Sequence, residues 1–85
     1  MKWGLIISNR ARRAMRDIPR EAAEQIDAAF IEMRADPYAG DLKFLKGTNR
    51  ALRRRVGVWR IMFEVLTDRR IIIIVDVERR GSHTY

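Results

Sequence analysis

Residues 49–65, NRALRRRVGVWRIMFEV, include the side chains of this chain that are best suited to contact a phosphate. Arg53, Arg54 and Arg55 follow one another, and Arg60 comes shortly after them. A guanidinium group is planar, permanently charged and offers a fork of N–H donors that matches phosphate oxygens. Such a group can hold a phosphodiester or stabilise charge that develops on it during a reaction.

The direction of these arginines depends on the strand that carries them. Side chains alternate across a strand, so Arg53 and Arg55 share one face and Arg54 takes the other. A turn or bulge expected at Gly57–Val58 leaves their facing relative to Arg60 open. One interpretation is a solvated edge strand, where arginines block edge-to-edge pairing, and the other is a phosphate contact. Three arginines exceed what edge protection requires, which favours the phosphate contact.

Arg60 belongs to a stretch whose alternation is typical of a half-buried strand. An apolar set alternates with it and is expected to face the core: Trp59, Ile61, Phe63 and Val65. Arg60 therefore points to the opposite face, where it stacks, forms an ion pair with Glu64 or Asp76, or awaits an anion.

The end of the chain carries residues that can move protons or stabilise charge. Arg79, Arg80, His83 and Tyr85 follow the last apolar stretch. Histidine and tyrosine donate or accept protons, and arginine stabilises charge on a phosphate. The alternative interpretation is a frayed terminus, as many chain ends are.

The net charge of +7 predicts an anionic partner. Residues 1–40 contain seven Lys or Arg against six Asp or Glu, whereas residues 41–85 contain eleven against five. Fifteen of the 18 basic residues are arginines. This distribution favours nucleic acid over a membrane surface or an acidic protein.

Several other classes of site do not fit the composition. The chain has no cysteine and one histidine, and it lacks a glycine-rich phosphate loop, so we expect neither a metal nor a nucleotide cofactor. The apolar run Leu5–Ile7 is too short for a signal peptide or a membrane span. Absence of cysteine suits a reducing cytosol but also a small secreted domain. We expect a cytoplasmic protein that is not embedded in a membrane.

Two amphipathic helices are predicted after a short apolar strand at residues 2–8. The first follows an N-cap at Ser8 or Asn9 and presents one apolar stripe: Ala11, Ala14, Met15 and Ile18. Pro19 suits the first turn of the second helix, which ends near Ala35 before the break DPYAGD.

Strand periodicity begins at Leu42 and continues through GVWRIMFEVL, the turn TDRR and the β-branched run IIIIVDV. The run IIIIVDV is typical of a central strand that is covered on both faces. We therefore predict a single α+β domain over residues 1–85: an N-terminal strand, a helical hairpin and a three-stranded antiparallel sheet, in the order β-α-α-β-β-β.

The order of these features resembles the RelE/ParE superfamily of bacterial type II toxins over nearly the whole chain. Four stretches carry the resemblance: ISNRARRAMRDIP, DPYAGDLKFLKG, ALRRRVGVWRIMFEV and the ending RRGSHTY. The third stretch, with its spacing to the tail, is the most specific.

The resemblance implies a toxin of one of two kinds. RelE-like toxins cleave mRNA in the ribosomal A site without a metal: the ribose 2′-OH attacks the adjacent phosphate and the 5′-oxygen leaves. ParE-like toxins share the fold and poison DNA gyrase without nuclease chemistry. We favour the endoribonuclease, with the gyrase inhibitor as the alternative; a plain RNA-binding module has only charge in its favour.

The resemblance also assigns roles to individual residues. Residues carried over as catalytic are Arg60, Arg53, Arg55, Arg80, Tyr85 and His83, with Arg79 as an alternative to Arg80 because the spacing to the end differs by one. Ala51 stands where some RelE proteins have a further lysine, so the general base stays open. Expected RNA contacts are Arg12, Arg13, Arg16, Lys43, Lys46, Arg54 and Arg79.

The expected partners follow from the same resemblance. A toxin of this kind binds a cognate antitoxin, and the RelE kind also binds the ribosome, through small-subunit rRNA, and mRNA. The free toxin is expected to be a monomer, and its complex with the antitoxin a hetero-oligomer.

Overall fold

The computed structural model describes residues 2–44 and 51–79 of the chain. The elements are β1 (Gly4–Ile7), α1 (Asn9–Arg16), α2 (Arg20–Ala35), β2 (Asp41–Phe44), β3 (Ala51–Val56), β4 (Trp59–Leu66) and β5 (Ile71–Arg79). They confirm the α+β class and the helical hairpin. Lys46, Arg80, His83 and Tyr85, which the sequence singled out, lie outside the described residues.

The sheet has five strands in the order β1-β5-β4-β3-β2, so the prediction of a three-stranded antiparallel sheet is corrected. β1 runs parallel to β5, and the other neighbours are antiparallel. β1 pairs with residues 71–74 of β5 rather than with its sequence neighbours, which is possible because the helical hairpin carries the chain away from β1. β2 is a separate edge strand of four residues, too short to show a period of its own.

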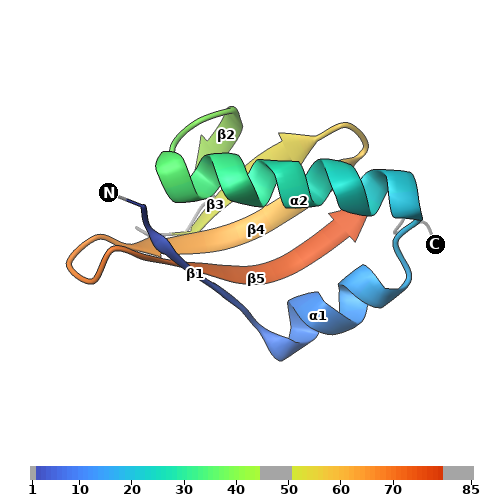
Figure 1. Ribbon diagram of the computed structural model, residues 1–85, viewed down its shortest axis with the longest axis horizontal. Coiled ribbons are helices and arrows are strands. Elements are labelled where there is room, and N and C mark those ends of the chain that lie inside the picture. The colour runs from blue at the N-terminus through green and yellow to red at the C-terminus, as the bar shows by residue number, and fades with distance from the viewer. Residues whose placement is uncertain (1, 45–50, 80–85) are drawn as a thin grey trace.

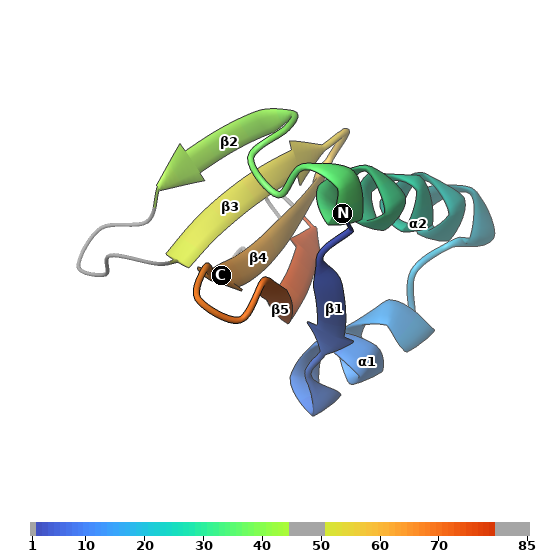
Figure 2. The same cartoon turned by 60° about the vertical axis from the view of Figure 1, so that its left-hand side comes forward.

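The two helices take different places beside the sheet. α2 lies across one face, in front of β3 and β4, while α1 lies beside β5 (Figure 1). In the turned view, α2 is again on one side of the strands, and the opposite side of β3 and β4 carries no described helix (Figure 2). No described helix is long and apolar enough to cross a membrane.

The core lies between α2 and the sheet and follows the predicted alternation. Ile61, Phe63 and Val65 are buried, and Trp59 packs against them at the end of the strand, which confirms the predicted core face of β4. The fully buried side chains come from both layers: Phe63, Ile26, Met33, Leu52, Ile61, Ile72 and Ile74. β5 is an interior strand between β1 and β4, as its β-branched run predicted, but it is not covered equally on both faces: Ile72, Ile74 and Val77 are buried and the residues between them are only partly buried.

Short polar contacts secure the first strand and helix. Ala11 N donates to Ser8 Oγ at 3.1 Å, so Ser8 is the N-cap of α1, and its hydroxyl donates to the Val75 carbonyl at 2.8 Å. Trp3 N donates to the Arg34 carbonyl at 2.8 Å, and Arg34 Nε donates to the Trp3 carbonyl at 3.1 Å. These bonds join β1 and α1 to β5 and to the end of α2.

A tight turn at Gly57–Val58 joins β3 to β4. Gly57 has φ of 62°, the left-handed conformation that a two-residue hairpin turn needs at its first position. The turn pairs Arg55 with Arg60 directly across the two strands. Paired residues of neighbouring strands share a face, so the question that the sequence left open is settled: Arg55 and Arg60 lie on the same side.

Arg54 points the other way, into the layer beneath α2. Arg54 is 8% exposed, its Nη2 forms an ion pair with Glu32, and its Nη1 donates to the Ala29 carbonyl at 3.5 Å. Gly40, at φ 89°, packs against the guanidinium group so closely that a Cβ there would lie 2.7 Å from Arg54 Nε. The arginine therefore links β3 to α2 and to the turn that leads into β2.

We predict that Gly40→Ala lowers the free energy of unfolding by about 1–3 kcal/mol, because it combines a left-handed backbone with a clash against Arg54. Gly4→Ala is the matched control: its Cβ would meet the nearest atom, Ile71 Cγ1, at 3.6 Å, which is ordinary contact, so it should change stability by no more than about 0.5 kcal/mol. Urea denaturation of both variants measures the difference. Equal stabilities would show that the packing of Gly40 on Arg54 contributes nothing.

Candidate functional site

A hollow of about 210 Å³ lies between the described side chains of three neighbouring strands, β2, β3 and β4. It is lined by Asp41, Leu42, Lys43, Arg53, Arg55 and Arg60, and we call it the basic hollow. Four of these six side chains are cations and one is an anion. The structure thus brings together three of the residues carried over as catalytic and one of the expected RNA contacts, Lys43.

Strand register explains why the cations converge. Lys43 lies directly across from Arg53, and Arg55 lies directly across from Arg60. Like charges opposite each other on one face of a sheet repel and destabilise the pairing. Two such pairs side by side form a region of positive potential that an anion would relieve.

The arginines of the basic hollow are not neutralised within the described part of the chain. None of the ion pairs found there within 4 Å involves Arg53, Arg55 or Arg60. Asp76, one predicted partner of Arg60, pairs instead with Arg10 Nε at 3.1 Å.

The other predicted partner of Arg60, Glu64, is displaced from it along the sheet. In the register, Glu64 lies across from Ala51 and Ile73, whereas the neighbour of Arg60 on β5 is Glu78. Arg60 therefore forms no ion pair with a carboxylate of the described residues. An exposed or half-buried arginine without a carboxylate partner remains able to bind an external anion.

Arg54 is withdrawn from the expected RNA contacts. It alternates with Arg53 and Arg55 and faces α2, where its guanidinium is committed to Glu32 and to the Ala29 carbonyl. At 8% exposure it offers almost no surface to a nucleic acid. The run of three arginines is thus two surface groups and one buried link between layers.

The remaining basic residues lie apart from the basic hollow. Arg12, Arg13 and Arg16 are exposed on α1, which lies beside β5, on the other side of the sheet order from β2 and β3 (Figure 1). Arg79 lies directly across from Trp59, which belongs to the core face of β4. Paired residues share a face, so Arg79 lies on the opposite face of the sheet from Arg60. Of the two tail arginines that the sequence proposed, the described one does not join the cluster.

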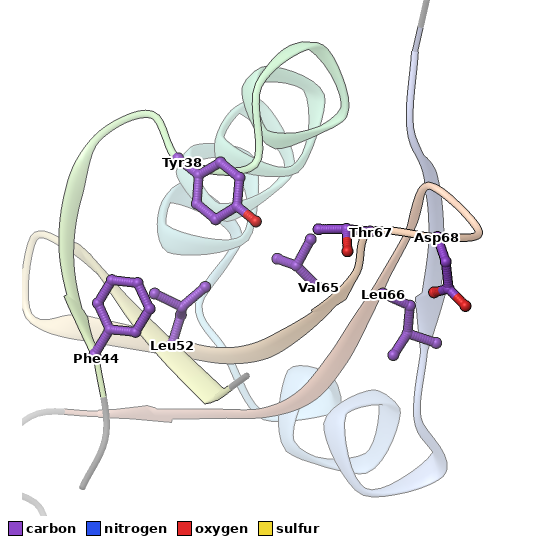
Figure 3. A pocket seen from close by; sticks show the side chains of 7 residues that line it. All are labelled: Tyr38, Phe44, Leu52, Val65, Leu66, Thr67 and Asp68. Atoms are coloured by element: carbon purple, nitrogen blue, oxygen red, sulfur yellow. The ribbon is translucent and has the colours of Figure 1, made fainter. Parts of the chain in front are cut away.

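A second hollow, of about 500 Å³, lies where β2, the end of β4 and the segment after α2 meet. In Figure 3, Tyr38 lies above Leu52 and Val65, Phe44 lies beside Leu52, and Thr67 and Asp68 lie farther along the wall of the hollow. Tyr38 is 47% exposed and Phe44 63% exposed. Among the described residues that line this hollow, none is an arginine or a lysine. Sequence reasoning did not anticipate it, because its two aromatic residues come from segments without a shared period.

Sequence reasoning also missed Asp41 as a member of the basic hollow. Asp41 is the first residue of β2 and lies directly across from Arg55. The signal available was a carboxylate two residues before Lys43, at the start of a strand that follows a glycine. That signal has no meaning until the register of β2 on β3 is known.

The comparisons with known proteins agree with this architecture. Residues 5–83 match the family described as the ParE toxin of the type II toxin-antitoxin system, parDE. A Methanocaldococcus jannaschii protein that is named as the toxin RelE1 is 31% identical over 83 residues, which cover 94% of this chain and 92% of the relative.

Two solved structures share the fold over nearly the whole length. The chain is similar to an archaeal RelE–RelB complex from Pyrococcus horikoshii, with a TM-score of 0.83, 21% identity and coverage of 96% of this chain and 99% of that one. It is also similar to the toxin–antitoxin complex RelBE2 of Mycobacterium tuberculosis, with a TM-score of 0.80, 21% identity and coverage of 94% and 100%. The extent of the family match and the identity to RelE1 place the chain in a family, and not only in a fold: it belongs to the ParE toxin family of type II toxin–antitoxin systems, within the RelE/ParE superfamily.

Proposed function

We propose that this toxin is a ribosome-dependent endoribonuclease that cleaves mRNA by attack of a ribose 2′-OH on the adjacent phosphodiester. The observation that carries the proposal is the pair of like-charged cross-strand contacts, Lys43 with Arg53 and Arg55 with Arg60, in one hollow. A purely structural surface has no reason to place four cations so that they repel. A phosphate in the hollow would turn each of these repulsions into an attraction.

The chemistry requires stabilisation of a phosphorane-like transition state that carries extra negative charge. Arg60 is half-buried in the hollow, where solvent screening is weaker than on a flat surface, so it is the group that we assign to this role. Arg53 and Arg55 flank it on β3 and hold the phosphates on either side. By resemblance, Arg80, His83 and Tyr85 remain proposed members of the same site, as charge stabiliser and as candidates for the acid or the base.

Affinity for the ribosome is proposed to come from two separate basic regions. The basic hollow would hold the message, while Arg12, Arg13 and Arg16 on exposed positions of α1 would contact phosphates of ribosomal RNA. Lys46, which the sequence analysis gave as an RNA contact, is also proposed to bind an RNA phosphate. Contacts spread over two parts of the molecule give orientation as well as affinity, because each phosphate contact fixes one point of the toxin on the RNA.

The antitoxin is proposed as the second partner of this chain. Several of the solved structures to which this chain is similar are toxin–antitoxin complexes, among them those of P. horikoshii and M. tuberculosis. A partner that neutralises the toxin would carry acidic side chains into the basic hollow, and its complex with the toxin would be a hetero-oligomer. Both proteins would act in the cytoplasm, where ribosomes are found.

An alternative function is supported by the family description itself, since the matching profile is that of ParE toxins. A ParE-like protein would inhibit DNA gyrase and would need no catalytic group. The basic hollow would then serve only to bind the antitoxin or the target. The two functions differ in their product: cut message in one case, and gyrase stalled on DNA in the other.

The first test of the proposed function concerns Arg60. Replacing it with alanine should lower the rate of mRNA cleavage by about 100-fold to 1,000-fold, because one donor to the transition-state charge is lost. Fold should be retained, since the change also removes the repulsion from Arg55. Primer extension on a translated message measures the cuts.

Arg69→Ala is the matched control for Arg60→Ala, because Arg69 is an exposed residue of the turn between β4 and β5 and does not line the basic hollow. It removes the same charge and should leave the cleavage rate within about twofold. A wild-type toxin that leaves the message intact and instead stalls gyrase would establish the alternative function. A folded Arg60→Ala variant with full activity would remove Arg60 from the mechanism.

The second test of the proposed function concerns Lys43, whose neighbour across the strands is Arg53. Lys43→Gln should raise the free energy of unfolding by about 0.2–1 kcal/mol, because a repulsion between like charges is removed. It should also weaken binding to ribosomes and reduce the slope of log affinity against log salt by about one, since one phosphate contact is lost. Urea denaturation and ribosome binding at several salt concentrations measure the two effects.

Lys2→Gln provides the comparison for Lys43→Gln, because Lys2 is an exposed lysine outside the sheet. It should change neither the stability nor the salt dependence. If Lys43→Gln weakened binding while also lowering stability, the repulsion that carries the proposed function would not exist.

A further inference from the structure

We propose that Asp41 is the general base of the cleavage reaction and takes the proton from the attacking 2′-OH. This inference rests on the proposed function and adds to it the residue that activates the nucleophile. It starts from one observation: the described residues that line the basic hollow include four cations and a single carboxylate. A site built only to bind phosphate would gain affinity without it, because Asp41 repels the anion that its neighbours attract.

Register places the carboxylate at one end of a straight row. Asp41 lies across from Arg55, Arg55 across from Arg60, and Arg60 across from Glu78, so one side chain from each of β2, β3, β4 and β5 stands in line on the same face. Of the two acids at the ends of this row, Asp41 lines the basic hollow and Glu78 does not. A phosphate held between Arg55 and Arg60 would therefore have Asp41 beside it.

Proton affinity singles out Asp41 among the lining residues. Guanidinium and ammonium groups ordinarily carry their protons at neutral pH and have no lone pair to accept another. Leu42 has no titratable group. A carboxylate is ordinarily ionised and accepts a proton through either oxygen. Among the described residues that line the basic hollow, Asp41 is thus the only one whose side chain can receive the 2′-OH proton.

The carboxylate is available for that role. Asp41 is exposed, and it forms no ion pair within 4 Å with any cation of the described residues. It is also held in place, because it directly follows Gly40, whose backbone packs on the buried guanidinium of Arg54. Arg54 in turn is the strand neighbour of both Arg53 and Arg55. One buried contact therefore positions the proposed base and the phosphate-binding arginines relative to each other.

The proposed step balances in atoms and protons. The 2′-oxygen forms a bond to phosphorus as its proton passes to an Asp41 carboxylate oxygen. The bond from phosphorus to the 5′-oxygen breaks, and the leaving oxygen takes a proton from water. The products are a 2′,3′-cyclic phosphate and a 5′-hydroxyl end, and Asp41 later returns its proton to solvent. No oxidant, reductant or metal is required.

Replacing Asp41 with asparagine separates a base from a structural or merely repulsive group. Asp41→Asn keeps the shape, removes the proton acceptor and removes the negative charge. We expect binding to ribosomes to become equal or tighter and the single-turnover cleavage rate at saturating toxin to fall by about 100-fold to 10,000-fold. Asp41→Glu should recover part of the rate, because the carboxylate is restored on a longer side chain.

Three further variants, all in the full-length chain, control this experiment. Asp27→Asn changes the net charge by the same amount at an exposed position of α2 and should leave the rate unchanged. Glu78→Gln removes the acid at the other end of the row, and His83→Gln removes the proposed base of the tail. Circular dichroism of each variant shows whether it is folded.

The outcomes distinguish the inference from the proposed function. Wild-type protein that does not cut programmed ribosomes overturns both. Cleavage by wild-type protein together with an undiminished rate in folded Asp41→Asn overturns the role of Asp41 alone, as does a loss of rate confined to Glu78→Gln or His83→Gln. Weaker ribosome binding by Asp41→Asn in proportion to its loss of rate overturns the role of base, since it would mean that Asp41 acts in binding.

Discussion

The two-residue turn at Gly57–Val58 sets the register of β3 against β4, and the positions of all the charges in the site depend on that register. Side chains on a strand alternate with a period of two, so a slip of one residue would move every arginine of β3 to the opposite face. Arg54 would then be exposed, while Arg53 and Arg55 would be buried beneath α2 without enough partners. The positive φ of Gly57 makes the turn possible, and the burial of Leu52 and Ile61 on the core face holds the register in place.

Burial of Arg54 is the second constraint, and it is an unusual one for so small a domain. Taking a guanidinium out of water is costly unless its charge and its N–H groups are matched. Glu32 supplies the charge and the Ala29 carbonyl a further acceptor, while Nε has no partner in the described part of the chain. The buried arginine instead fixes the relative positions of the elements that it contacts. A single side chain contacts α2, the turn before β2 and its own strand, so the edge strand that carries Asp41 and Lys43 is tied to the core.

Stability and binding are opposed on the face where β2, β3 and β4 present their charges. Lys43 with Arg53 and Arg55 with Arg60 repel, and each such contact weakens the sheet that carries it. The opposite face of the same strands compensates for this loss of stability, because its side chains Phe63, Ile61 and Leu52 are almost completely buried. Without a bound anion, the cations of the basic hollow therefore repel one another on a sheet that its buried apolar face stabilises. Binding of an anionic partner, whether RNA or protein, would relieve this repulsion and stabilise the fold.

Local patterns in the sequence determined the elements and the sign of the surface. The stripe from Ile26 to Met33 sets the buried face of α2, the alternation from Trp59 to Val65 sets the faces of β4, and Ser8 marks the start of α1. These features depend on spacings of a few residues, which a sequence displays directly. Net positive charge and its concentration after residue 40 were equally visible.

The tertiary structure alone decided which charges meet. β1 pairs with β5 from the far end of the described chain, and β2 pairs with β3, from which residues 45–50 separate it, so neither pairing leaves a periodic pattern in the sequence. Alternation along the strand separated Arg54 from its two neighbours, but only the packing of α2 on the sheet decided that the face of Arg54 is the buried one. Asp41 became part of the site only through its register with Arg55. The face on which a side chain lies within one strand follows from local geometry, whereas the pairing between strands follows from the packing of the whole chain. The basic hollow is formed by side chains that meet across paired strands, so the sequence alone could not reveal it.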